Sequence, residues 1–170
     1  INANSAYTVF DKDDGIKGLV RKIEKINNRL FFNTTEDLYF IDSKKENSLD
    51  LKVNNLKFND LPRNFIEFNN SIIAINSKKM IEINSNFQSK TISNLGSYQS
   101  PSNSLLNKNL LIVSDPAEGL LFFEKIKNNF SLKYKKGIKD DIGVIGFREL
   151  SPGVLYVEAT GDEGSFIVNY

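Results

Sequence analysis

Carboxylate side chains recur in the short polar stretches that follow apolar runs of the sequence. A carboxylate in such a stretch can accept hydrogen bonds from sugar hydroxyls or supply oxygen ligands to a cation. If the stretches gather on one face of the folded chain, their acidic groups would form a polar rim for such a ligand. The candidate residues of this rim are Glu36, Asp37, Asp115, Glu118, Asp162 and Glu163.

The same residue types also build tight turns, so turn formation alone accounts for most of these carboxylates. Calcium needs six or more oxygens from a shaped loop, and neither Asp13-Asp14-Gly15 nor Asp140-Asp141 has alternating ligands at a suitable spacing. The sequence also defines no pair of carboxylates at a separation that glycoside hydrolysis would need. We therefore predict no catalytic residue, no metal site and no cofactor.

The stretches that would connect repeated units of the chain contain or adjoin three further candidates: Arg63, Tyr98 and Arg148. An Arg there can pair with a carboxylate or phosphate of a ligand, although an Arg at such a boundary more often ties two structural elements together. Together with five of the acidic residues, they complete the predicted ligand-binding set: Glu36, Asp37, Arg63, Tyr98, Asp115, Glu118, Arg148 and Asp162.

The composition narrows the classes of function. With 22 basic and 21 acidic residues, the net charge is +1, which gives no bulk attraction to nucleic acid or to an anionic membrane. The chain has no cysteine and no histidine, so it offers no disulfide, thiol or imidazole chemistry. No apolar run approaches the roughly 18 residues of a membrane span. There is no signal peptide, and the start at Ile1 favours an excised piece of a longer protein.

The elements that must position these residues recur along the chain. Each copy is an apolar run, a tight polar loop and a second apolar run, too short and too rich in β-branched and aromatic residues for helices. Equivalent positions are 42, 38 and 45 residues apart, at Leu30, Ile72, Leu110 and Leu155. Such a period, with several strands in each copy, is typical of β-propeller blades. We predict an all-β fold of about four four-stranded antiparallel propeller blades.

The repeats predict a single propeller domain over residues 1–170, with blades at about 16–54, 56–94, 95–137 and 138–170. The segment Ile16–Ile26 has the apolar spacing of an amphipathic helix, but the repeat favours an inner strand over Val20–Ile26. We place the outermost strand of the first blade at 48–53 and the innermost strand of the third blade at 104–107.

The fourth blade lacks an outermost strand in this sequence. In one interpretation Tyr7–Phe10 supplies that strand and closes a ring of four blades. In the other, which we favour, the chain is part of a larger propeller, for example a seven-bladed one, and Tyr7–Phe10 belongs to a preceding blade.

The segment from Asn28 to Asp42 resembles the propeller repeat of the two-component regulator sensor family. That repeat has an aromatic-rich strand ending in Gly-Thr, followed by Gly-Leu-Tyr; here Asn33-Thr34 and Asp37-Leu38-Tyr39 stand in those places. The third copy retains Gly119-Leu120-Leu121, whereas the second is the poorest match, with Lys79-Met80-Ile81. The resemblance covers about residues 15–168.

The resemblance implies a non-enzymatic ligand-sensing module of a bacterial signalling receptor, located in the periplasm or otherwise outside the cytoplasm. It implies a small-molecule or glycan ligand, an output domain or kinase in the parent chain, and homodimers, with no role for nucleic acid. A ligand would act by favouring one arrangement of blades or subunits over another. The alternatives are a scaffold for protein–protein interaction and, third, a carbohydrate-active enzyme.

Overall fold

The computed structural model describes residues 12–13, 15–27, 29–42, 53–55, 62–94, 96–138, 143–160 and 164–170. The regular structure of these residues is β-strand throughout, and each strand pairs antiparallel with a neighbour in sequence. Among them there is no helix of the length and hydropathy needed to cross a membrane. The predicted all-β class is therefore confirmed.

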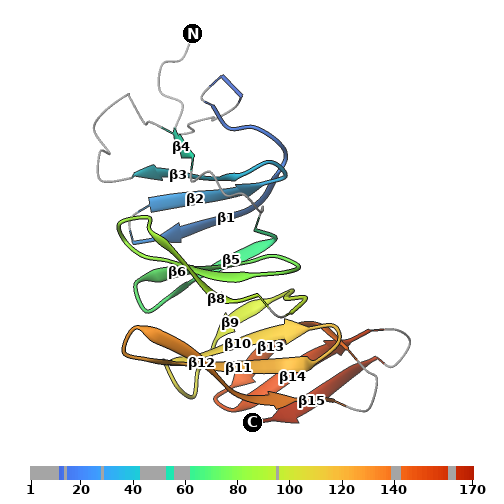
Figure 1. The fold of residues 1–170 in the computed structure, drawn as a ribbon. Coiled ribbons are helices and arrows are strands. Elements are labelled where there is room, and N and C mark those ends of the chain that lie inside the picture. The colour runs from blue at the N-terminus through green and yellow to red at the C-terminus, as the bar shows by residue number, and fades with distance from the viewer. Residues whose placement is uncertain are drawn as a thin grey trace. The chain divides into compact units, whose positions relative to one another are not determined.

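The chain divides into two compact units, residues 1–61 and 62–170. The described part of the first unit contains a sheet in the order β1-β2-β3-β4 (Figure 1). One face of this sheet packs in a small core of Ile16, Phe32, Tyr39 and Ile41. The strands are β1 (Val20–Ile26), β2 (Arg29–Thr34), β3 (Leu38–Asp42) and β4 (Val53–Asn55).

The second unit contains three sheets that follow one another along the chain, and we call them blades B, C and D (Figure 1). Blade B consists of β5 (Asn64–Phe68), β6 (Ser71–Ile75), β7 (Met80–Ile83) and β8 (Ser89–Ser93). Blade C consists of β9 (Pro101–Asn103), β10 (Leu110–Asp115), β11 (Gly119–Ile126) and β12 (Asn129–Lys136). Blade D consists of β13 (Val144–Ser151), β14 (Val154–Ala159) and β15 (Ser165–Asn169).

Apolar side chains fill the spaces between successive blades of the second unit. Ile73 and Ile75 of blade B pack in one core with Leu111 and Val113 of blade C. The alternate residues of β10 point the other way, and Ile112 packs in a second core that belongs to blades C and D. Because both faces of β6 and β10 are covered, every residue of these strands is buried, and their sequences read as continuous apolar runs.

Contacts at or next to the first strands link successive blades of the second unit. The Asn103 side chain on β9 donates from Nδ2 to the Glu67 carbonyl of β5 at 2.8 Å, and β10 of blade C contacts β13 of blade D. The first strand of blade C thus lies against the first strand of blade B, and the first strand of blade D lies against β10, as expected for blades that pack one after another around a propeller axis.

The structure decides between the two interpretations of Ile16–Ile26. Val20–Ile26 is strand β1, paired with β2 from Val20 to Ile26, and not the helix that its apolar spacing also permits. The apolar spacing permits a helix, but the segment forms a strand because β2 supplies its backbone with hydrogen-bond partners.

The prediction for the innermost strand of blade C is wrong. The strand β9 ends at Asn103, and Ser104 begins a turn in which its Oγ accepts from the N–H groups of Leu106 and Asn107 at 3.1 and 3.0 Å. Leu105 and Leu106 suggested a strand because they are apolar, yet both are exposed. A hydroxyl that binds backbone N–H groups favours a turn over a strand.

Several predictions fall on parts of the chain outside the described residues. They concern the strand residues 48–52, the proposed strand Tyr7–Phe10, the connection Leu56–Leu61, and the acidic residues Asp14, Asp140, Asp141, Asp162 and Glu163.

Candidate functional site

Glu36 and Asp37 form the turn between β2 and β3 of the first unit. The Thr34 hydroxyl oxygen accepts from their N–H groups at 3.1 and 3.0 Å, and the Asp37 Oδ1 accepts from the Leu38 N–H at 2.9 Å. Asp37 therefore helps to shape its own turn, while the Glu36 side chain is exposed.

Asp115 is buried at the end of β10, with 1% of its surface exposed. Its Oδ1 accepts from the N–H groups of Ala117 and Glu118 at 2.8 and 3.0 Å, and its Oδ2 accepts from the Ser97 N–H at 2.7 Å. Three backbone donors thus hold the carboxylate, which ties the β10–β11 turn to the β8–β9 connection. Glu118 is exposed on the same turn and forms an ion pair with Lys135 at 2.5 Å.

Tyr98 is buried in the same region as Asp115. Only 1% of its surface is exposed, its hydroxyl donates to the Ser93 Oγ at 2.5 Å, and its ring meets the edge of Phe123 at 6.4 Å between centroids. The residue therefore fills the core between blades B and C instead of facing a ligand in solvent.

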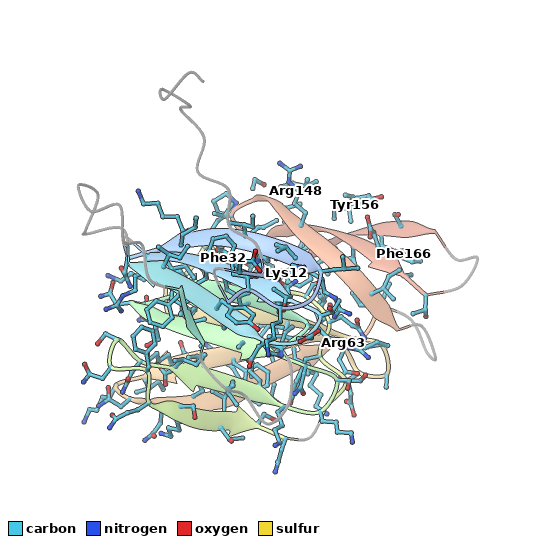
Figure 2. All side chains as sticks on the ribbon, turned by 90° about the horizontal axis from the view of Figure 1, so that it is seen from above. Lys12, Phe32, Arg63, Arg148, Tyr156 and Phe166 are labelled. Atoms are coloured by element: carbon cyan, nitrogen blue, oxygen red, sulfur yellow. The ribbon has the colours of Figure 1, made fainter. Side chains whose placement is uncertain are left out.

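The two arginines of the predicted set are exposed (Figure 2). Arg63 precedes β5, where its N–H donates to the Ile75 carbonyl at 2.7 Å. Arg148 lies on β13, opposite Tyr156 of β14, on the side of blade D that faces away from blade C. The predicted set therefore contains exposed charged groups and buried structural groups together, and Asp162 lies outside the described residues.

A polar cleft lies between blades B and C, in the second unit. Its volume is about 610 Å³, within the size range of ligand sites in proteins. Serine hydroxyls line it at Ser71, Ser85 and Ser89, and carboxamide side chains line it at Asn69, Asn70, Asn84, Gln88 and Asn128. None of the lining residues belongs to the ligand-binding set predicted from the sequence.

Three turns at the same ends of their strands build the cleft. In the β5–β6 turn, Asn69 and Asn70 have φ of 47° and 62°, the pair of left-handed residues that a tight type I′ hairpin requires and that Asn tolerates. In the β7–β8 turn, the Asn84 Oδ1 accepts from the N–H groups of Asn86 and Gln88, both at 3.0 Å. The β11–β12 turn contributes Asn128.

An ion pair forms part of the wall of the cleft and joins the two blades. The Lys125 Nζ of β11 lies 2.6 Å from the Glu82 Oε1 of β7, and the two side chains are only 13% and 12% exposed. The Lys125 ammonium also lies 5.3 Å from the centre of the Phe130 ring, a favourable cation–π distance. Since both charges are largely removed from water, this pair fixes blade B against blade C.

A second lysine spans the cleft, and no carboxylate of the described ranges forms an ion pair with it. The Lys90 Nζ on β8 donates to the Asn128 carbonyl at 3.1 Å and to the Asn129 Oδ1 at 2.8 Å, and both acceptors are neutral. The side chain is exposed. The cleft is therefore lined by hydrogen-bonding groups, by one neutralised charge pair and by one additional positive charge.

The arrangement of the cleft offers many hydrogen-bonding groups to a ligand. Among the described residues, no three acidic side chains come close enough to hold a metal ion. The cleft residues can donate and accept many hydrogen bonds, and most of them are held by turns whose conformations the backbone fixes.

No protein-family model matches this sequence, and no curated protein matches it. Solved structures do match by shape. The N-terminal domain of Nup159 superposes with a TM-score of 0.64 and 14% identity, covering 89% of this chain and 45% of that one. YCF48 bound to D1 peptide gives 0.61 and 9% identity, covering 89% and 51%.

A third structure, of S. cerevisiae Dbp5 bound to Nup159, Gle1, IP6 and ADP, also gives a TM-score of 0.61, at 11% identity, covering 89% of this chain and 47% of that one. This chain spans about half the length of each solved structure. These similarities confirm that the chain is built from β-propeller blades, and at such low identity they concern the fold alone. They do not extend to the two-component regulator sensor family.

Proposed function

We propose that this chain is a non-enzymatic recognition module that binds a segment of another protein in the cleft between blades B and C. The observation that carries the proposal is the lining of the cleft, where carboxamides, hydroxyls and Lys90 surround about 610 Å³ of open space. Most small-molecule sites are lined largely by apolar and aromatic side chains. A polypeptide, by contrast, presents a main-chain donor and acceptor at nearly every residue, which this lining complements.

Two of the similar structures support the proposal, because each of them is a protein complex. Dbp5 is bound to Nup159 in one of them, and YCF48 is bound to D1 peptide in another. Propellers of this general shape can therefore serve as scaffolds for protein interaction, which was the alternative function in the sequence analysis.

Peptide selection followed by a blocking substitution tests the proposal. Peptides selected from a random phage-displayed library on the immobilised protein would be synthesised and titrated by calorimetry. We expect Ser89→Trp to weaken their binding by roughly tenfold or more, because the indole would occupy the cleft that Ser89 lines.

Ser131→Trp is the matched control, since Ser131 is also an exposed serine of an outer strand, β12, and does not line the cleft. Its peptide affinities should equal those of the unmodified protein. Selected peptides that bind Ser89→Trp as tightly as the unmodified protein would contradict the location of the site. A library that yields no binder would contradict the function.

Ligand sensing in a bacterial receptor outside the cytoplasm is a second proposal, supported by the resemblance of Asn28–Asp42 to a sensor repeat. The ligand would then be a small molecule or glycan that stabilises the folded protein. A thermal-shift screen with glycans tests it, because a ligand that binds only the folded state raises the melting temperature. Reading the parent gene beyond Tyr170 would also test it, since a soluble end without a membrane span and kinase would count against a sensor.

A further inference from the structure

We infer that the ligand of the cleft is an extended peptide segment with an acidic side chain, whose carboxylate binds the Lys90 ammonium. This inference rests on the proposed function, because it specifies the ligand chemistry of the same cleft.

The charges in the cleft point to an anionic group on the ligand. Glu82 and Lys125 neutralise each other at 2.6 Å, whereas Lys90 donates to two neutral oxygens. Among the described residues, no carboxylate forms an ion pair with Lys90. An ammonium has three donors, so one remains for an acceptor, and hydrogen bonds between charged partners are about twice as strong as neutral ones.

The amides around Lys90 point to a peptide main chain. Gln88 and Asn128 line the cleft together with Lys90, and Asn70 lines it from the β5–β6 turn. Each carboxamide offers donors and an acceptor, which match the N–H and C=O groups of an extended peptide. Among the residues that the structure describes, the lining includes no aromatic side chain on which a sugar ring would stack, so this lining suits a peptide better than a glycan.

Fluorescence polarisation with defined peptide pools tests this inference. The pools are acetylated, C-terminally amidated hexapeptides in which one fixed position is Asp, Asn or phosphoserine and the others vary among uncharged residues. A further Asn pool has a free C-terminal carboxylate. Each pool is titrated with the unmodified protein, with Lys90→Gln and with Lys108→Gln, which removes the same charge from the β9–β10 turn, outside the cleft.

We expect the Asp pool to bind roughly tenfold more tightly than the amidated Asn pool to the unmodified protein and to Lys108→Gln. This preference should disappear in Lys90→Gln, which should bind the Asp pool and the amidated Asn pool with equal affinity, because the ammonium that distinguishes the two pools is gone. Lys90 is exposed on an edge strand, so its replacement should leave the melting temperature unaltered.

Equal binding of the Asp and amidated Asn pools would overturn the inference while leaving the proposed function intact. A preference that survives Lys90→Gln, or that is found only for phosphoserine or for the free C-terminus, would also overturn it. If no pool binds, the proposed function fails together with the inference.

Discussion

The carboxylate of Asp115 has a structural role. Backbone N–H groups of Ser97, Ala117 and Glu118 occupy both of its oxygens, and its side chain is buried. Lys90, by contrast, is exposed and binds neutral acceptors. At the scale of single residues, the availability of a polar group depends on what already binds it, and this distinguishes a ligand contact from a structural one.

Glu82 is expected to be a major contributor to stability among the charged residues. Replacing Glu82 with Gln would leave the Lys125 ammonium, 13% exposed, without its counter-charge, and we expect a loss of about 3 kcal/mol in the free energy of unfolding. Lys125→Met in addition should recover most of this loss, since an apolar chain can occupy the same space against Phe130. Urea unfolding of the two single variants and the double variant measures the coupling. A Glu82→Gln protein as stable as the original would refute this role.

Tyr170 should make the protein sensitive to alkaline pH. Burial, together with a hydrogen bond from its hydroxyl to Glu149, raises the pKa of Tyr170 from 10.0 to about 12. Because the folded-state pKa is the higher one, the stability from the protonated hydroxyl is complete below pH 10 and is lost as the pH rises towards 12.

Tyr170→Phe tests this expectation. The variant loses hydrogen bonds to Glu149 and Ser104, both at 2.6 Å, so at pH 8 we expect it to be about 1–2 kcal/mol less stable. Between pH 10 and pH 11.5 the difference from the unmodified protein should shrink. Urea midpoints measured over this range would disprove the assignment if the difference stayed constant.

At the scale of strands and connections, backbone contacts fix how blade C leads into blade D. Gly143 precedes β13, and a Cβ built on it would lie 1.6 Å from the Pro116 carbonyl oxygen. Its N–H donates to the Thr160 Oγ1 at 3.1 Å. The close approach of two backbone segments requires glycine at this position.

Gly143→Ala should therefore destabilise the protein by about 3 kcal/mol, because a methyl group there would force the β10–β11 turn away from β13. Gly137→Ala is a matched control in the same connection, since a Cβ at Gly137 would meet nothing within 4 Å, and its effect should stay below about 0.5 kcal/mol. Thermal and urea unfolding compare the two variants. Equal effects would mean that the contact with Pro116 does not hold this connection in place.

The burial of a strand residue depends on whether a neighbouring blade covers that face of the sheet. The apolar runs of β6 and β10 are buried on both faces, whereas β14 alternates, with Leu155, Val157 and Ala159 buried and Tyr156 and Glu158 exposed. This alternation shows that, among the described residues, blade C covers one face of blade D and the other face is exposed. The lysines of β12 are largely exposed along an edge strand, where charged side chains oppose pairing with a further strand.

At the scale of the whole molecule, protection from solvent should follow the position of each strand within its blade. We expect the amides of Ser71–Ile75 and Leu110–Asp115 to exchange most slowly with deuterium, because these strands are central and covered on both faces. The outer strands Ser89–Ser93 and Asn129–Lys136 should exchange faster, since each lies at a sheet edge. Hydrogen exchange with mass spectrometry measures this order, and outer strands as protected as the central ones would contradict the blade arrangement.

The sequence by itself determined the repeated antiparallel sheets of this chain. Strand formation depends on local alternation and on β-branched and aromatic runs, so β1 and the strands that follow could be located from residue types and the repeat. The error at β9 arose where apolar residues, Leu105 and Leu106, belong to an exposed turn. These two residues are exposed in spite of their hydropathy, because hydrogen bonds to the Ser104 hydroxyl hold this segment in a turn.

Only the tertiary structure decided where a ligand could bind. The residues of the cleft extend from Asn69 to Asn128, and the contacts that shape it join Glu82 to Lys125 and Lys90 to Asn128. The sequence spacing carries no sign of these pairs, because they form only when two separately folded blades pack together. The same packing buries Tyr98, whose position near a connection between repeats predicts a ligand contact.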